Sequence, residues 1–115
     1  MKVLICGGRD YQDKEKIFQT LDAMHNATPI SLVVHGAARG ADLLGEEWAK
    51  SREIAYYGVP AKWQELGRKA GPLRNLDMLA RITPDLVIAF PGGRGTDNMI
   101  KLASCNNIKV KQIEP

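Results

Sequence analysis

The sequence predicts one α/β domain over residues 1–115, with a mostly parallel five-stranded sheet and helices on both faces. Two observations predict this class. Short apolar runs alternate with amphipathic segments along the whole chain, and strands that alternate with helices through short connections are typical of parallel sheets. The runs KVLIC and DLVIAF are almost entirely apolar, as strands are when helices cover both of their faces.

The five strands are expected where apolar runs stop at glycine, proline or polar residues. The first run ends at Gly7 and Gly8, and the second ends at Gly36. The third run is more polar than the others, which favours a position near an edge of the sheet. In chain order, strands are expected at residues 2–6, 31–35, 54–59, 85–90 and 108–113.

Helices are expected where apolar residues recur at helical spacing. Ile17 and Leu21 share one face of the first helix, and Trp48 lies on an apolar face of the second, so we expect it in the core. Pro72 opens the third helix, because the first turn tolerates proline, and Thr96 is a good cap for the fourth. The helices are expected at residues 13–25, 41–52, 72–81 and 96–106, and the irregular stretch 60–71 has room for a short one.

Composition narrows the class of protein. The chain is 44% hydrophobic and 25% charged, and no apolar run approaches the roughly 18 residues of a membrane span. The apolar stretch at the N-terminus is too short for a signal peptide, so we expect a cytoplasmic protein with no membrane partner. A formal net charge of +3 suits an anionic partner; it permits nucleic acid without indicating it.

Cysteine and histidine give no metal signature. Cys6 and Cys105 each lie in or beside an apolar segment, so we expect free buried thiols. The two cysteines and two histidines show no short spacing of the kind that metal sites use. We therefore expect neither a metal nor a cofactor.

Three similar loops leave the predicted sheet at the carboxyl ends of strands. They are GGRDY at 7–11, GAARGAD at 36–42 and PGGRGT at 91–96, and each combines glycine with arginine. Ligands of parallel sheets bind at this edge, where glycines let backbone amides approach an anion and arginine grips phosphate oxygens. Any one loop could be a simple turn, but the three together predict a site for an anionic ligand. None has the Walker ending or the Gly-x-Gly-x-x-Gly fingerprint, so neither ATP hydrolysis nor dinucleotide redox chemistry is expected.

Four segments in order, KVLICGGRDY, VVHGAARGAD, AGPLRN and DLVIAFPGGRGT, resemble the YspA/YpsA-related branch of the SLOG superfamily. That superfamily includes the LOG phosphoribohydrolases, the DNA-processing protein DprA and ligand-sensing domains of bacterial immune systems. The resemblance implies a Rossmann-like fold and a ligand derived from ADP-ribose or NAD, or a nucleoside monophosphate. It also identifies PGGRGT as similar to the phosphate-binding turn of the superfamily.

The same resemblance argues against catalysis. In LOG enzymes this turn continues to a glutamate that serves hydrolysis of the N-glycosidic bond, and Met99 occupies that position here. A thioether cannot activate water or stabilise positive charge on the sugar. Arg74 falls where those enzymes carry an arginine, so the resemblance implies binding without hydrolysis, and no catalytic residue is expected.

Together the loops and the resemblance give the expected ligand-binding residues. Arg9, Arg39, Arg74 and Arg94 are expected to converge around one anion. Tyr11 either stacks on a base or packs in the fold, and Trp63 either closes over the ligand or packs. The ligand-binding residues are expected to be Gly7, Gly8, Arg9, Tyr11, Gly36, Arg39, Arg74, Gly92, Gly93, Arg94, Gly95 and Thr96.

For four other side chains, the sequence allows either a role in acid–base chemistry or a purely structural role. Asp10, Asp42 and Asp97 adjoin the three loops, but the last two fall in first turns of predicted helices, where a carboxylate complements the helix dipole. His35 lies at the end of a predicted strand, and it is either a general base or a structural histidine.

The leading expectation is a protein that binds a nucleotide-derived small molecule, of ADP-ribose or cyclic ADP-ribose type, and senses or sequesters it in phage or bacterial immune signalling. One alternative is a LOG-like nucleotide N-glycosidase with a relocated acid. Another is binding of single-stranded nucleic acid, as the DprA resemblance allows, although only 6% of residues are aromatic. A homodimer or higher homo-oligomer is expected.

Overall fold

The computed structural model describes residues 1–115 and places all five strands in one parallel sheet. The sheet order is β3-β2-β1-β4-β5, and each neighbouring pair runs parallel, which confirms the predicted fold class. The more polar third strand forms one edge, as its composition indicated. The strands are β1 (Lys2–Cys6), β2 (Leu32–His35), β3 (Ala55–Gly58), β4 (Leu86–Ala89) and β5 (Lys109–Gln112).

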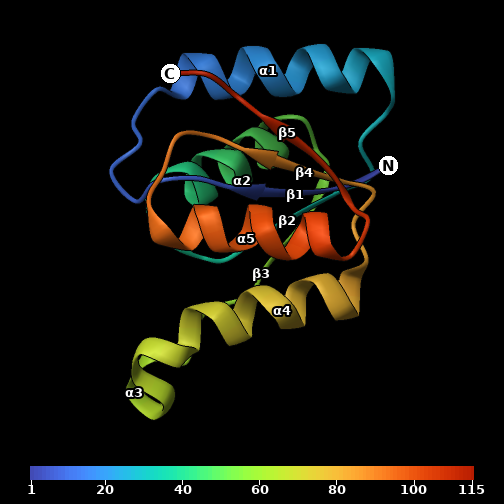
Figure 1. Ribbon diagram of the computed structural model, residues 1–115. Helices are drawn as coiled ribbons and strands as arrows, with labels where there is room; N and C mark the ends of the chain where they lie inside the picture. Colours follow the sequence, from blue (N-terminus) through green and yellow to red (C-terminus); the bar gives the residue numbers. More distant parts are fainter.

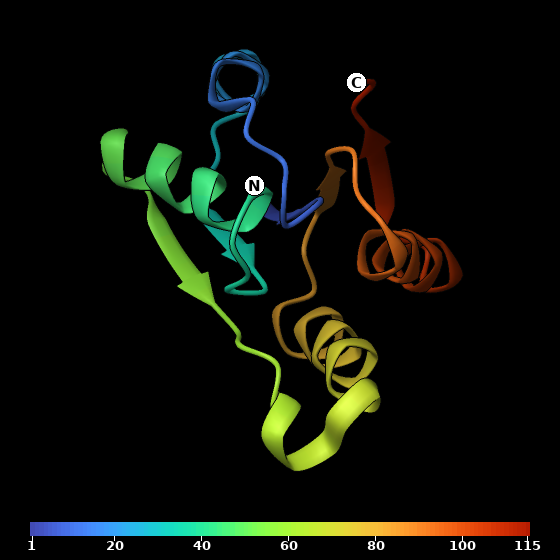
Figure 2. The ribbon, with the colours of Figure 1, turned by 90° about the vertical axis from the view of Figure 1, so that its left-hand side faces the viewer.

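Helices cover both faces of the sheet. In Figure 1, α1 lies above the sheet and α4 and α5 lie below it; Figure 2 shows α2 beside α1 on the first face. The irregular stretch before α4 contains a short helix and a 3-10 turn, as its length allowed. The helices are α1 (Lys14–Ala27), α2 (Ala41–Ser51), α3 (Trp63–Leu66), η1 (Gly67–Lys69), α4 (Ala70–Ile82) and α5 (Arg94–Cys105).

The core lies in two layers because side chains alternate along the central strand. Val3 and Ile5 pack against α1 and α2, while Leu4 between them packs against α4 and α5. Trp48 is fully buried in the first layer, where its indole N–H donates to Asp22 Oδ1 at 2.9 Å. Its expected place in the core is therefore confirmed.

Two helices begin earlier than the sequence predicts. α4 begins at Ala70, so Pro72 is its third residue; a proline fits there because first-turn amides have no acceptor inside the helix. α5 begins at Arg94 with Gly93 as its N-cap. Thr96 is therefore not the cap but a buried residue of the first turn.

The two thiols are free, but only one is sheltered. Cys6 is partly buried at the end of β1, whereas Cys105 is exposed on the last turn of α5. The expectation of two buried thiols is therefore wrong for Cys105. The inner face of that helix is occupied by Met99 and Ala103, which leaves position 105 facing solvent.

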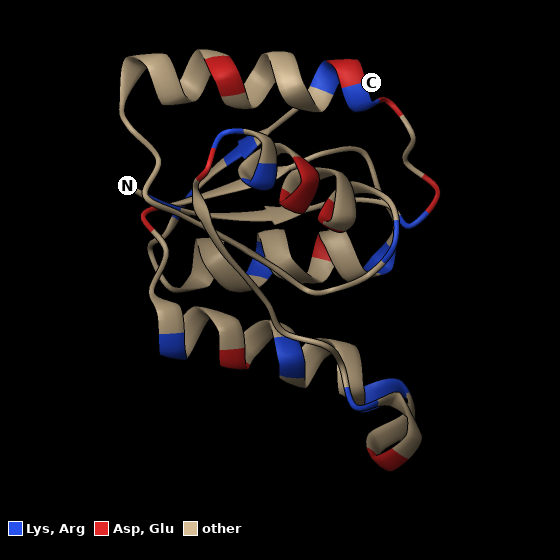
Figure 3. Cartoon of the chain, turned by 180° about the vertical axis from the view of Figure 1, so that it is seen from behind, with Lys and Arg blue, Asp and Glu red and all other residues tan.

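Charges of both signs are spread over the outer helices (Figure 3). Along α4, for example, Arg81 pairs with Asp77 one turn earlier at 2.8 Å. None of the helices has the length and hydropathy of a membrane span.

Strand order reverses between β1 and β4. From β1 the chain adds β2 and β3 on one side, and then crosses to place β4 and β5 on the other. The loops that follow β1 and β4 therefore leave neighbouring strands in different directions. This is where open parallel sheets form a ligand crevice.

Candidate functional site

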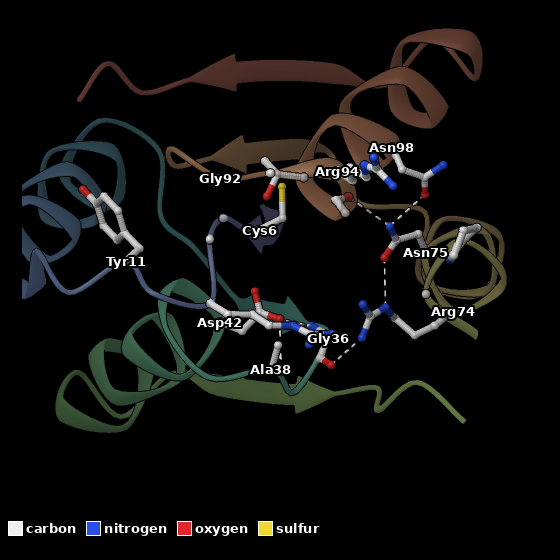
Figure 4. Close-up of a pocket in the computed structure, with 18 of the residues that line it drawn as sticks. Cys6, Tyr11, Gly36, Ala38, Asp42, Arg74, Asn75, Gly92, Arg94 and Asn98 are labelled. Carbon is white, nitrogen blue, oxygen red and sulfur yellow. Dashed lines mark hydrogen bonds between the residues drawn. The ribbon is translucent and has the colours of Figure 1, made fainter. Parts of the chain in front are cut away.

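A pocket of about 820 Å³ occupies the carboxyl edge of the sheet at this reversal point. Loops after β1, β2 and β4 form three of its walls (Figure 4). Trp63 of α3, Arg68 of η1 and the start of α4 complete it. Eleven of the twelve expected ligand-binding residues line it, and their role in binding stays a prediction. They are Gly7, Gly8, Arg9, Tyr11, Gly36, Arg74, Gly92, Gly93, Arg94, Gly95 and Thr96.

Arg39 is the expected residue that does not line the pocket. Its guanidinium is 70% exposed and donates to Asp10 Oδ1 at 3.1 Å. Of the four arginines expected to converge, Arg9, Arg74 and Arg94 line the pocket and Arg39 lies outside. The loop after β2 directs it away, because Gly40 turns the chain there with a φ of 82°.

The glycines of the PGGRGT loop fall into two groups. A side chain at Gly92 would collide with Thr96 Oγ1 and would place its Cβ 2.7 Å from the amide nitrogen of Gly8. Gly92 therefore allows the loops after β1 and β4 to touch, and the Gly8 N–H donates to the Pro91 carbonyl at 2.8 Å. At Gly93 and Gly95, in contrast, an added Cβ would meet no atom within 4 Å. These two glycines leave space that a ligand can occupy.

Two helix N-termini lie near the pocket, and they differ in what occupies them. At α2 the Ala41 N–H donates to the Gly8 carbonyl at 3.2 Å, so the protein itself occupies this end. At α5 no side chain caps Gly93, and the amides of residues 94–96 have no acceptor in the molecule. A helix N-terminus with free amides attracts anions. The start of α5 therefore has the free amides that the predicted phosphate-binding loop needs, and phosphate binding there stays a prediction.

Cationic side chains outnumber acids around the pocket. Four arginines line it, against Asp10 and Asp42. Arg9, Arg68 and Arg94 form no ion pair, and the Arg9 guanidinium lies 5.2 Å from the centroid of the Trp63 ring. The pocket is thus electrostatically suited to an anion.

Arg74 is largely engaged with the protein. Its guanidinium donates to the carbonyls of Gly36 and Val59 and, through Nε, to Asn75 Oδ1 at 2.9 Å. Burial lowers its pKa below the ordinary value, although the nearby Asp42 opposes this. Arg74 therefore ties the ends of β2 and β3 to α4, a role that the sequence did not indicate.

Asn75 continues this network to the start of α5. It is 4% exposed, and its Nδ2 donates to Asn98 Oδ1 at 2.9 Å and to the Gly95 carbonyl at 3.3 Å. These bonds hold α4 against the first turn of α5, as Figure 4 shows. Sequence reasoning did not find this residue; the asparagine that follows Arg74 in AGPLRN was its only signal.

Asp42 shapes the loop after β2. Its Oδ2 accepts hydrogen bonds from the amides of Gly36 at 3.0 Å and Ala38 at 3.2 Å. Burial raises the pKa of this carboxyl above its ordinary value, although the Ala38 hydrogen bond lowers it in part. Burial, and to a lesser degree Asp42, also raises the pKa of the neighbouring Cys6 thiol to about 12. Cys6 is therefore a neutral thiol at physiological pH.

Two positions at which a LOG-like acid would be sought, 99 and 97, lie away from the pocket. Met99, at the position of the LOG glutamate, is 1% exposed and packs in the core layer between the sheet and α4 and α5. Asp97 borders a separate cavity of about 250 Å³ beside the C-terminal residues. Neither lines the large pocket.

His35 has a structural role. It is 1% exposed, and its Nδ1 accepts the Ala37 amide at 2.9 Å. Because a backbone N–H can only donate, Nδ1 carries no proton, and Nε2–H donates to Glu46 Oε1 at 2.9 Å. Both ring nitrogens are thus occupied.

Two aromatic side chains, Tyr11 and Trp63, line the pocket. The Tyr11 ring packs against Phe90, with centroids 5.6 Å apart, so it lies in the lining and in the fold at once. Trp63, the first residue of α3, is 46% exposed.

Comparisons with known proteins agree with this architecture. The Gene 61 protein of Mycobacterium phage D29 is 38% identical over 117 residues, which cover 95% of this chain and 93% of that protein. The crystal structure of UDP-GlcNAc 2-epimerase from Neisseria meningitidis bound to UDP-GlcNAc superposes with a TM-score of 0.62 over 99% of this chain, at 23% identity. The chain spans 32% of that structure's length, and the likeness shows the fold alone. The model of the YspA, cpYpsA-related SLOG family matches residues 1–66, more than half of the sequence. The chain therefore belongs to the YspA, cpYpsA-related SLOG family.

Proposed function

We propose that this protein binds a nucleotide-derived anion of ADP-ribose or cyclic ADP-ribose type and releases it unchanged. The observation that carries the proposal is the start of α5, where free amides and the open positions Gly93 and Gly95 face the pocket with Arg94. Arg9 and Arg68 add positive charge that no carboxylate neutralises. The volume, about 820 Å³, lies in the upper part of the range for small-molecule pockets. This size suits a nucleotide with a further sugar or phosphate better than orthophosphate.

Binding without turnover is supported by the placement of the acids. Position 99 carries Met in place of the LOG glutamate, Asp97 does not line the pocket, and Asp10 is paired with Arg39. Asp42 lines the pocket, but one of its oxygens is held by two amides. The amides and arginines contact phosphate in the ground state, so they give affinity without lowering the barrier to glycosidic cleavage. The role that we propose is sensing or sequestration of a signalling nucleotide. The similarity to a phage protein supports sequestration.

A ligand screen by thermal unfolding tests the proposal. ADP-ribose, NAD, cyclic ADP-ribose isomers and AMP are compared with orthophosphate. A nucleotide at 100 times its dissociation constant should raise the free energy of unfolding by about 2.7 kcal/mol. Gly95→Trp is the matched control, because its side chain enters open space and should fill the site without disturbing the fold.

Two results would overturn the proposal. One is the absence of any nucleotide effect together with tight binding of single-stranded DNA. The other is the release of free base from AMP over many turnovers, detected by chromatography after long incubation, which would favour the N-glycosidase. Mass spectrometry of nucleotides that co-purify with the protein identifies the ligand independently.

A further inference from the structure

One carboxylate oxygen in the wall of the pocket has no hydrogen-bond partner in the protein. Asp42 is 6% exposed, and both of its hydrogen bonds go to the same oxygen, Oδ2. The other oxygen, Oδ1, receives no hydrogen bond from the protein. Every fully buried polar side-chain atom has a hydrogen-bond partner, so Oδ1 is not fully buried. Because Asp42 lines the pocket, Oδ1 is accessible from it. Figure 4 shows it pointing toward the middle of the pocket, away from Gly36 and Ala38.

The position of this oxygen opposes that of the phosphate site. Asp42 lies on the wall formed by the loop after β2, and the start of α5 with Arg94 lies on the wall across from it, with Cys6 between them (Figure 4). An ionised carboxylate repels phosphate and accepts hydrogen bonds from hydroxyl groups. A ligand that fits both walls therefore carries an anion at one end and a hydrogen-bond donor, such as a hydroxyl, at the other.

We propose that Asp42 Oδ1 accepts a hydrogen bond from a ribose hydroxyl, so that the pocket selects ribonucleotides over deoxyribonucleotides. This inference rests on the proposed nucleotide-binding function. The carboxylate is held in place before the ligand arrives, because the amides of Gly36 and Ala38 fix Oδ2. A site built to bond a hydroxyl rejects an analogue without it, since its buried acceptor is then left unpaired. The loss of one hydrogen bond to a charged group corresponds to an affinity about 10- to 100-fold weaker.

The test measures affinity by calorimetry at pH 8 for AMP, 2′-deoxy-AMP and 3′-deoxy-AMP, with ADP-ribose as the larger probe. The native protein should bind AMP about 10- to 100-fold more tightly than at least one deoxy analogue. Asp42→Asn can keep its amide oxygen on Gly36 and Ala38 while turning its NH₂ into the pocket. This variant should show a smaller preference, because its NH₂ can only donate to the hydroxyl oxygen in a weaker, uncharged hydrogen bond.

Asp97→Asn is the control, because it removes a charge near α5 from a residue outside the pocket. It should shift all three affinities by one common factor and keep their ratios. Equal affinities of the native protein for AMP and both deoxy analogues would overturn the inference, even if Asp42→Asn failed to fold. So would a ribose preference of undiminished size in Asp42→Asn. Failure of every nucleotide to bind would instead refute the proposed function itself.

Discussion

Replacing Gly92 and Gly95 separately by alanine tests whether the glycines of PGGRGT serve the fold or the ligand. At Gly92 the new Cβ would collide with Thr96 Oγ1 and lie 2.7 Å from the Gly8 nitrogen, so the loops after β1 and β4 must separate. Such overpacking costs about 1–3 kcal/mol. At Gly95, inside α5, the Cβ meets nothing, and exchanging glycine for alanine in a helix should stabilise the fold by about 0.4–1 kcal/mol.

These free energies convert into measurable melting temperatures. A chain of this length has an unfolding entropy of about 240 cal/mol/K, so each kcal/mol moves Tm by about 4 °C. Scanning calorimetry should therefore show Gly92→Ala about 4–12 °C lower than the native protein, and Gly95→Ala about 2–4 °C higher. Nucleotide affinity should fall in Gly95→Ala despite its greater stability, because the methyl group enters open space at a position that lines the pocket. A Gly92→Ala protein with native Tm would refute the contact between the two loops as the reason for that glycine.

Three further outcomes are expected. Arg94→Ala should weaken nucleotide binding about 10- to 100-fold in calorimetry. Arg39 lies outside the pocket, so Arg39→Ala should leave the affinity unchanged. Equal losses of affinity in the two variants would contradict the placement of both residues. Met99→Glu should lower the free energy of unfolding by about 3 kcal/mol or more without creating cleavage, because it buries an unpaired carboxylate in an apolar layer. The control Met99→Leu should be tolerated. A Met99→Glu protein that is stable and hydrolyses nucleotides would show that the side chain reaches the pocket. Since the pKa of Cys6 is about 12, iodoacetamide at pH 8 should label exposed Cys105 and spare Cys6 in the native protein, and mass spectrometry showing rapid labelling of Cys6 would contradict its neutral state.

The sequence predicted the sheet, the helices and the lining of the pocket because each depends on a local pattern. Apolar runs that end in glycine locate the strands, and the parallel arrangement then brings the following loops to one edge. Arg39 was misplaced because its loop has the same composition as the others. The turn at Gly40, which depends on a close approach to the Gly8 carbonyl, is not visible in composition.

Features that depend on distant contacts escaped prediction. Asn75 bonds to Asn98, 23 residues away, and Arg74 bonds to the Gly36 carbonyl, 38 residues away. No periodicity reports such pairs. The exposure of Cys105, in contrast, could have been predicted: Met99 and Ala103 lie one turn apart on the buried face of α5, and position 105 does not share that face.

The segment Trp63–Lys69, which contributes Trp63 and Arg68 to the wall of the pocket, adds little to the stability of the molecule. No residue from Trp63 to Lys69 is buried, and neither α3 nor η1 belongs to a core layer. Substitutions in this segment should therefore have small effects on folding while they change the groups that face a ligand. Under the proposed function, natural variation in this segment would change which nucleotide binds, while the first turn of α5, fixed by packed loops, would keep the proposed phosphate position. Relatives in this family should differ in ligand preference mainly at the positions that correspond to Trp63–Lys69.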